Sequence, residues 1–152
     1  MSVDVMTETV IDRPRTEVAA FTTDPDNAPR WYANIKSVEW STEPPLRLGS
    51  RIEFVAEFLG RRLAYTYEIV EYVPDERVVM RTAEGPFPME TTYTWALSGQ
   101  GSTRMTLRNR GLPSGFSKLA APVMAASMRK ANRKDLERLK QLLEAPEVPA
   151  VC

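Results

Sequence analysis

The sequence predicts an α+β fold in which a seven-stranded antiparallel sheet wraps around one long C-terminal helix. Three observations lead to this prediction. Successive stretches of the chain alternate between apolar and polar residues, which is typical of strands with one buried face. Proline and glycine recur between these stretches, as in the turns of an antiparallel sheet. Only one long stretch has apolar residues at helical spacing, so a single helix is available to cover the buried face.

Residues 2–11 (SVDVMTETVI) are predicted to form the first strand, and two short helices are expected to follow it. Pro14 precedes the segment TEVAAFT, at a place where the first turn of a helix tolerates proline. Asp24 and Pro25 form a helix-start pair, because the aspartate side chain can cap the helix and proline has a pre-set φ. We therefore expect the second short helix over residues 24–32.

Six further strands are predicted over residues 36–42, 50–58, 61–73, 77–83, 89–98 and 102–110. In RIEFVAEF the apolar side chains fall on one face and the charged side chains on the other. The alternation changes phase after Ile69, which indicates a β-bulge. The positions predicted to face the interior are Ile52, Phe54, Ala56, Phe58, Leu63, Tyr65, Tyr67, Ile69, Met89, Tyr93, Trp95, Leu97, Met105 and Leu107.

The long helix is predicted to start near Phe116 and to run to about Leu143. Pro122 either lies inside this helix and bends it, or marks the place where the regular helix begins. The apolar positions that recur at steps of three and four residues are Phe116, Leu119, Val123, Met124, Met128, Ala131, Leu136, Leu139 and Leu143.

Small residues occupy much of the first half of this helix, namely Ala120, Ala121, Ala125, Ala126 and Ser127. They are too small to fill the space between a helix and a curved sheet. Either bulky aromatic residues of the sheet fill that space as a packed core, or a cavity remains. Empty volume costs about 24 cal/mol per Å³, so a lasting cavity suggests a ligand. Both alternatives are open at this point.

The composition excludes several classes of function. The 152 residues include no histidine, which removes Ser-His-Asp and Cys-His nucleophiles and most zinc sites. Twenty basic and twenty acidic residues balance, so no nucleic-acid partner is expected. No apolar run approaches the roughly 20 residues of a membrane span, and no secretory signal is evident, so we expect a cytoplasmic protein. Residues 1–145 are predicted to form one domain, followed by a short tail at 146–152.

Three segments resemble a known superfamily: VIDRPRTEVAAFTTDPDNAPRW, YEIVEYVPDERVVMRT and GSTRMTLR. They are similar to the START-related, Bet v 1-like helix-grip (SRPBCC) proteins, in the polyketide cyclase/dehydrase branch, and the resemblance covers Val3 to Leu143. It implies a hydrophobic cavity between the sheet and the long helix, with adaptable methionines in its roof. The oxygenase branch is excluded, because its iron is ligated by histidine. The segment TEPPLRLGS has one glycine, so the glycine-rich loop of plant members is not present.

The leading hypothesis is a protein that binds or carries a small lipophilic or aromatic molecule, without cofactor or metal, as a monomer or a homodimer. One alternative is an aromatase/cyclase or dehydratase-type enzyme, in which Tyr65, Tyr67 or Arg81 would polarise a carbonyl or move a proton. Another is a protein-interaction module that uses a sheet edge or the basic segment RKANRK. A purely structural role is open for each candidate. The candidate ligand-binding residues are Trp31, Phe54, Phe58, Tyr65, Tyr67, Arg81, Tyr93, Trp95, Met105, Met124 and Met128.

Overall fold

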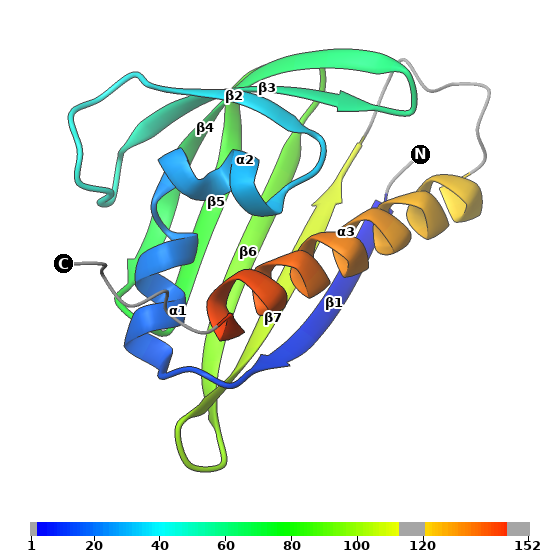
Figure 1. Cartoon of the computed structure of the whole chain (residues 1–152). Coiled ribbons are helices and arrows are strands. Elements are labelled where there is room, and N and C mark those ends of the chain that lie inside the picture. Colours follow the sequence, from blue (N-terminus) through cyan, green and yellow to red (C-terminus); the bar gives the residue numbers. More distant parts are fainter. Residues whose placement is uncertain (1–2, 113–120, 146–152) are drawn as a thin grey trace, which may run out of the picture.

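A computed structural model describes residues 3–112 and 121–145 of the chain (Figure 1). A first strand is followed by short helical segments, six more strands and one long helix. In chain order the elements are β1 (Val3–Ile11), α1 (Arg15–Thr22), the 3-10 turn η1 (Pro25–Asn27), α2 (Ala28–Trp31), β2 (Ile35–Trp40), β3 (Arg51–Phe58), β4 (Arg61–Val73), β5 (Arg77–Glu84), β6 (Met89–Ser98), β7 (Ser102–Gly111) and α3 (Ala121–Glu144).

The seven strands form one antiparallel sheet in the order β1-β7-β6-β5-β4-β3-β2. Strands β2 to β7 follow one another as a meander, and β1 joins the far edge beside β7. The sheet curves around α3, which crosses its concave face, while α1 and α2 lie at one end of the groove (Figure 1). The predicted α+β helix-grip fold is therefore confirmed.

The alternation of the strands places the core as the sequence predicts. In β3, Ile52, Phe54 and Ala56 are buried, whereas Arg51 and Glu53 are exposed. The pairing of β4 with β5 shifts register between Ile69 and Glu71, which confirms the bulge. Leu97 was predicted to be buried, and this is wrong because 74% of it is exposed. It is the second-last residue of β6, next to the hairpin that joins β6 to β7.

The hairpin between β3 and β4 has a two-residue turn, Leu59 and Gly60, with φ of 51° and 76°. Two positive φ angles in such a loop are the mark of a type I′ turn, whose twist matches that of the flanking strands. This turn brings Phe54 directly opposite Tyr65, and Ile52 opposite Tyr67. The register set by the turn thus assembles an aromatic wall on the concave face.

Helix α3 is described from Ala121, so Pro122 is the second of its described residues. The predicted positions Phe116 and Leu119, and the small residue Ala120, lie outside the described residues. Leu136 and Leu139 are buried as predicted. Val123 was also predicted to lie on the apolar face, and this is wrong because 50% of it is exposed. Its neighbour Met124 takes the buried position on the helix.

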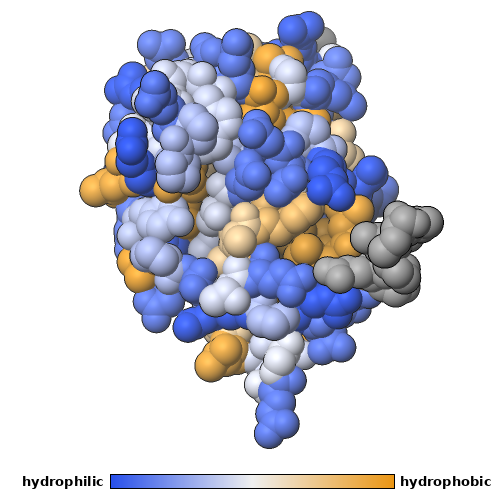
Figure 2. Space-filling model, turned by 60° about the vertical axis from the view of Figure 1, so that its left-hand side comes forward, coloured by the Kyte–Doolittle hydropathy of each residue, from blue (hydrophilic) through white to orange (hydrophobic). Residues whose placement is uncertain are grey.

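The surface is largely hydrophilic in Figure 2, with an apolar area right of the centre and further apolar side chains near the top, at the left edge and toward the bottom of that view. Within residues 3–112 and 121–145, no helix is both long and apolar enough to cross a membrane.

Candidate functional site

A cavity of about 170 Å³ lies between the concave face of the sheet and α3. Thr22, Pro25 and Tyr32, from the α1 to α2 region, contribute to one part of its wall. Met124 of α3 and Leu63 of β4 also line it, and these two residues belong to a hydrophobic cluster separate from the main core. Most of the lining atoms are apolar, so the cavity offers an environment suited to a lipophilic molecule.

The structure brings seven of the eleven predicted ligand-binding residues together around this cavity. They come from strands β3, β4 and β6 and from α3, which crosses the concave face of the sheet. These residues are Phe54, Phe58, Tyr65, Tyr67, Tyr93, Met124 and Met128. Their shared position makes them candidates for ligand contact, and that role remains a prediction.

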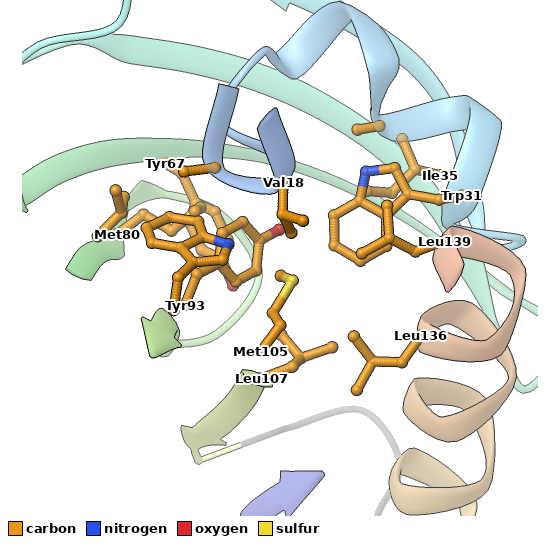
Figure 3. Close-up of a cluster of buried hydrophobic side chains, with 14 of the residues drawn as sticks. Val18, Trp31, Ile35, Tyr67, Met80, Tyr93, Met105, Leu107, Leu136 and Leu139 are labelled. Atoms are coloured by element: carbon orange, nitrogen blue, oxygen red, sulfur yellow. The ribbon is translucent and has the colours of Figure 1, made fainter. Parts of the chain in front are cut away.

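Three other predicted residues, Trp31, Trp95 and Met105, do not line the cavity and belong to the packed core beside it. Their exposed fractions are 1%, 3% and 0%. Figure 3 shows Trp31 of α2 close to Leu139 of α3, and Met105 of β7 close to Leu107. Trp31 thus packs α2 against α3 and the sheet, outside the lining of the cavity, and its contact with a ligand stays a prediction.

Arg81 is the fourth predicted residue that does not reach the cavity. Its Nε donates to Glu90 Oε2 at 2.7 Å, and Arg110 Nε donates to the other oxygen of Glu90 at 2.9 Å. The three residues stand side by side on the outer face of β5, β6 and β7. Because Met80 and Thr82 on either side point into the cavity, Arg81 must point outward, and it is corrected to a surface residue.

The wall of the cavity on β3 and β4 is aromatic. The ring centroids of Phe54 and Tyr65 are 5.6 Å apart, and those of Tyr65 and Tyr67 are 4.9 Å apart. Such tilted and offset contacts are favourable arrangements of aromatic rings. The stacking holds the rings in place, so the wall has a defined shape before any ligand enters.

Three of the polar side chains that the sheet contributes to the cavity are tyrosines, and the others are Thr82, Thr91 and Asn109. Tyr67 lies 2.9 Å from Thr91, oxygen to oxygen, and Thr91 donates to Asn109 Oδ1 at 2.6 Å. Because Thr91 uses its only hydroxyl proton on Asn109, Tyr67 must donate to Thr91. The hydroxyls of Tyr32 and Tyr93 are 2.7 Å apart. The hydroxyl of Tyr65 has no hydrogen-bond partner among the described residues.

Burial raises the pKa of each of these tyrosines. The pKa of Tyr67 rises to about 12, and burial together with the neighbouring Tyr93 raises the pKa of Tyr32 well above its ordinary value. Burial also raises the pKa values of Tyr65 and Tyr93. The hydroxyls therefore stay protonated at neutral pH and can donate hydrogen bonds, but they cannot act as bases there.

Two polar residues of α3, Asn132 and Asp135, line the cavity opposite the tyrosines and were missed by the sequence prediction. Asp135 is 3% exposed, and its Oδ1 accepts from the backbone N–H of Ala33 at 3.1 Å. Burial raises the pKa of its carboxyl to about 6. Asn132 is 6% exposed, and its Nδ2 has no hydrogen-bond partner in the described structure. Their spacing from Met128, four and seven residues, could have placed them on the apolar face.

Among the described residues, no group of three or more cysteine, aspartate or glutamate side chains is positioned to hold a metal ion. The site therefore offers an apolar cavity, tyrosine hydroxyls that can donate hydrogen bonds, the side-chain amide of Asn132 and the carboxyl of Asp135, whose pKa is about 6.

A sheet that grips a long helix over an apolar cavity defines the helix-grip class of proteins. Within this class, the chain belongs to the polyketide cyclase/dehydrase and lipid transport family, whose model matches residues 2–144. The predicted resemblance to the polyketide cyclase/dehydrase branch is thereby confirmed. Comparison with curated proteins finds no match.

Solved structures share the fold at low sequence identity. A START superfamily protein from Mycobacterium smegmatis is 14% identical with a TM-score of 0.78, and the match covers 93% of this chain and 97% of that one. The Zhui aromatase/cyclase from Streptomyces sp. R1128 is 14% identical with a TM-score of 0.77, covering 95% and 94%. The major latex-like protein 151 of Panax ginseng is 16% identical with a TM-score of 0.74, covering 94% and 98%. These likenesses show the fold.

Proposed function

We propose that the protein binds a small, mostly apolar molecule in the cavity between the sheet and α3. The observation that carries this proposal is the cavity itself, about 170 Å³ of space with a largely apolar lining. Unfilled volume of this kind lowers stability, so its presence in a molecule with a well-packed core next to it favours a binding role. The family description, which includes lipid transport, agrees with the proposal.

The size of the cavity limits the ligand. A cavity of about 150 Å³ accepts one benzene ring, whereas pockets for drug-sized ligands have about 300–1,000 Å³. At about 170 Å³ this cavity suits a one-ring aromatic or a short branched aliphatic molecule. Burying roughly 300 Å² of apolar surface contributes about 7 kcal/mol before the costs of association, so we expect micromolar or weaker affinity. We also expect a cytoplasmic monomer or homodimer.

A first experiment is mass spectrometry of the purified protein, native and after solvent extraction, followed by calorimetric titration of the stripped protein with p-xylene. A variant that fills the cavity, Ala131→Leu, serves as the matched control, because Ala131 lines the cavity from α3. We expect p-xylene to bind the wild type and to bind Ala131→Leu at least tenfold more weakly. Equal affinity for both proteins would place the binding elsewhere and overturn the proposal.

A second candidate function is acid–base catalysis, which one observation favours: Asp135 is buried in the cavity and its pKa is about 6. A carboxyl that titrates near neutrality can take up and return a proton efficiently. Neutral tyrosine hydroxyls in the same cavity can donate hydrogen bonds to a carbonyl oxygen. This combination suits removal of a proton next to a carbonyl group, a step that a cyclase or dehydratase needs.

The enzymatic candidate is tested with acetophenone in heavy water, with exchange of its methyl protons followed by NMR. Catalysis predicts faster exchange with the wild type than with Asp135→Asn, while both proteins bind acetophenone. If the wild type binds acetophenone and exchange does not exceed the rate in buffer, the carrier function is favoured. A deprotonated Asp135 is required, so the rate should rise with pH and level off above about pH 7.

A further inference from the structure

Two polar residues of α3 lie in the wall of the cavity that faces the sheet. Asn132 and Asp135 are three residues apart on this helix, a spacing at which side chains are neighbours on one face. Both line the cavity and both are more than nine-tenths buried. The remaining cavity-lining residues of α3, Met124, Met128 and Ala131, are apolar, so the two polar groups form a distinct place on that wall.

Asn132 presents an unpaired hydrogen-bond donor at this place. Its Nδ2 is buried and has no partner within residues 3–112 and 121–145. A buried donor without an acceptor is unfavourable, and such groups in folded proteins usually have a protein, water or ligand partner. Because Asn132 lines the cavity, an acceptor oxygen on a bound molecule can serve as the partner of this amide.

Asp135 presents an acceptor next to it. Its Oδ1 accepts from the Ala33 N–H, whereas its Oδ2 has no donor in the described part of the chain. No hydrogen bond from a nearby charged or titratable group reaches it in this part of the chain. Arg138 Nε donates to the carbonyl of Arg30 at 2.7 Å, and the Tyr32 and Tyr93 hydroxyls share one hydrogen bond, which leaves one of their two protons unused. Because Asp135 lines the cavity, a donor group on a bound molecule can serve as the partner of this oxygen.

From this pairing we infer that the ligand carries a hydroxyl group, which accepts a hydrogen bond from Asn132 and donates one to Asp135. The inference rests on the proposed binding function and narrows its ligand class to lipophilic alcohols and phenols. A hydroxyl is the small group that both accepts and donates. A ketone or ether would satisfy Asn132 alone, and a carboxylate would be repelled by Asp135. If an ordered water occupies this place, only a hydroxyl replaces it without losing either bond.

The test compares three one-ring probes that differ at one position: p-cresol carries a hydroxyl, p-xylene carries a methyl group in its place, and 4-methylanisole accepts but does not donate. Dissociation constants are measured by calorimetry at a pH of about 8, where Asp135 is ionised. We expect the wild type to bind p-cresol about tenfold more tightly than either other probe. In a purely apolar cavity p-xylene would bind more tightly than p-cresol, because the hydroxyl of p-cresol would lose its hydrogen bonds to water without gaining others.

The variants assign the preference to its residues. Asn132→Leu should remove the preference for p-cresol, with the affinity for p-xylene changed by less than about twofold. In Asp135→Asn the amide oxygen can still accept from Ala33, so the amide nitrogen faces the cavity and 4-methylanisole should bind as tightly as p-cresol. Glu137→Gln makes the same chemical change as Asp135→Asn on the exposed face of the helix and should leave all three constants unchanged.

The outcomes separate this inference from the proposed function. If none of the probes binds, the proposed binding of a one-ring molecule fails, and this inference fails with it. If the probes bind and p-xylene binds as tightly as p-cresol, the cavity binds ligands but the hydroxyl inference is overturned. It is overturned as well if Tyr65→Phe, rather than Asn132→Leu, removes the preference. If Asn132→Leu does not fold, two results decide whether the inference holds. They are the order of the three affinities in the wild type and the loss of the difference between p-cresol and 4-methylanisole in Asp135→Asn.

Discussion

The two halves of α3 meet the same sheet in different ways. Toward its C-terminus, Leu136 and Leu139 pack against the core that contains Trp31, Met105 and Leu107 (Figure 3). Toward its N-terminus, Met124, Met128 and Ala131 border the cavity. The difference arises because α2 supplies the bulky Trp31 at one end, and no tryptophan borders the cavity at the other. Burial alone therefore does not tell whether the space next to a residue is filled.

The largest expected difference lies between a truncation in the packed half and one at the cavity. Leu139→Ala should lower the free energy of unfolding by about 3–4 kcal/mol, because Leu139 is fully buried and its removal leaves a new void. Met128→Ala should cost about 1 kcal/mol, because that side chain already borders empty space and is partly exposed. Urea unfolding followed by tryptophan fluorescence measures both. Equal losses would mean that the N-terminal half is packed as tightly as the other.

The next effect is the pH dependence of stability, and it concerns Asp135, one of the two polar residues of α3 in the cavity. The pKa of Asp135 is raised from 3.8 to about 6 on folding, so the folded state binds more protons than the unfolded state between these values. The contribution of Asp135 to the free energy of unfolding should therefore fall as pH rises through that window and level off above it. Asp135→Asn has no carboxyl at this position and does not show this loss. The free energy of unfolding of the variant minus that of the wild type should therefore increase by about 2–3 kcal/mol from pH 3.5 to pH 7.

Thermal and urea unfolding across this pH range check the prediction, with Glu137→Gln as the exposed control on the same helix. A difference between Asp135→Asn and the wild type that does not change with pH would show that the carboxyl is already solvated in the cavity.

Adding volume should have opposite signs at the two kinds of site. Ala131→Leu fills part of the cavity and should raise the free energy of unfolding by about 1 kcal/mol. Ala19→Leu adds the same atoms to the buried core beside α1, where there is no cavity, and should lower it by about 1–3 kcal/mol. Calorimetric melting temperatures of the two variants give the comparison. Destabilisation by both changes would contradict the presence of free space beside Ala131.

The smallest effect separates two tyrosines of the same strand. Tyr67→Phe removes the hydrogen bond to Thr91 and should lower stability by about 1 kcal/mol. Tyr65→Phe removes a hydroxyl without a partner in the described structure, so it should leave stability unchanged within about 0.5 kcal/mol. Denaturant midpoints of the two proteins decide the matter, and a larger loss for Tyr65→Phe would reveal a partner for its hydroxyl.

The sequence was sufficient to predict the fold because its signals are local. Alternation along β3, the phase change after Ile69 and the Asp24–Pro25 pair each determine a short segment, and the single long helix leaves one way to cover the sheet. The side of the sheet that Phe54, Tyr65, Tyr67 and Tyr93 face follows from the same alternation.

The site could be predicted only in part because it depends on distances between elements. Trp31, Trp95 and Met105 face inward as apolar residues should, yet whether they border core or cavity depends on where α2 and α3 lie over the sheet. Arg81 was placed wrongly because VVM before it is apolar without alternation, which obscures the phase of β5. Asn132 and Asp135 were overlooked because polar residues within a charged helical stretch are usually exposed.

The position of β1 at the sheet edge next to β7 has a consequence for how the chain folds. β1 pairs only with β7, so Ile11 meets Thr103 and Val5 meets Asn109 across most of the sequence. Contacts this distant require closing a long loop before they contribute stability, which slows folding to the range of about milliseconds to seconds. During synthesis β1 has no sheet partner until β7 has left the ribosome. We therefore expect its amides to gain protection from hydrogen exchange together with those of β7, in the last step of sheet formation.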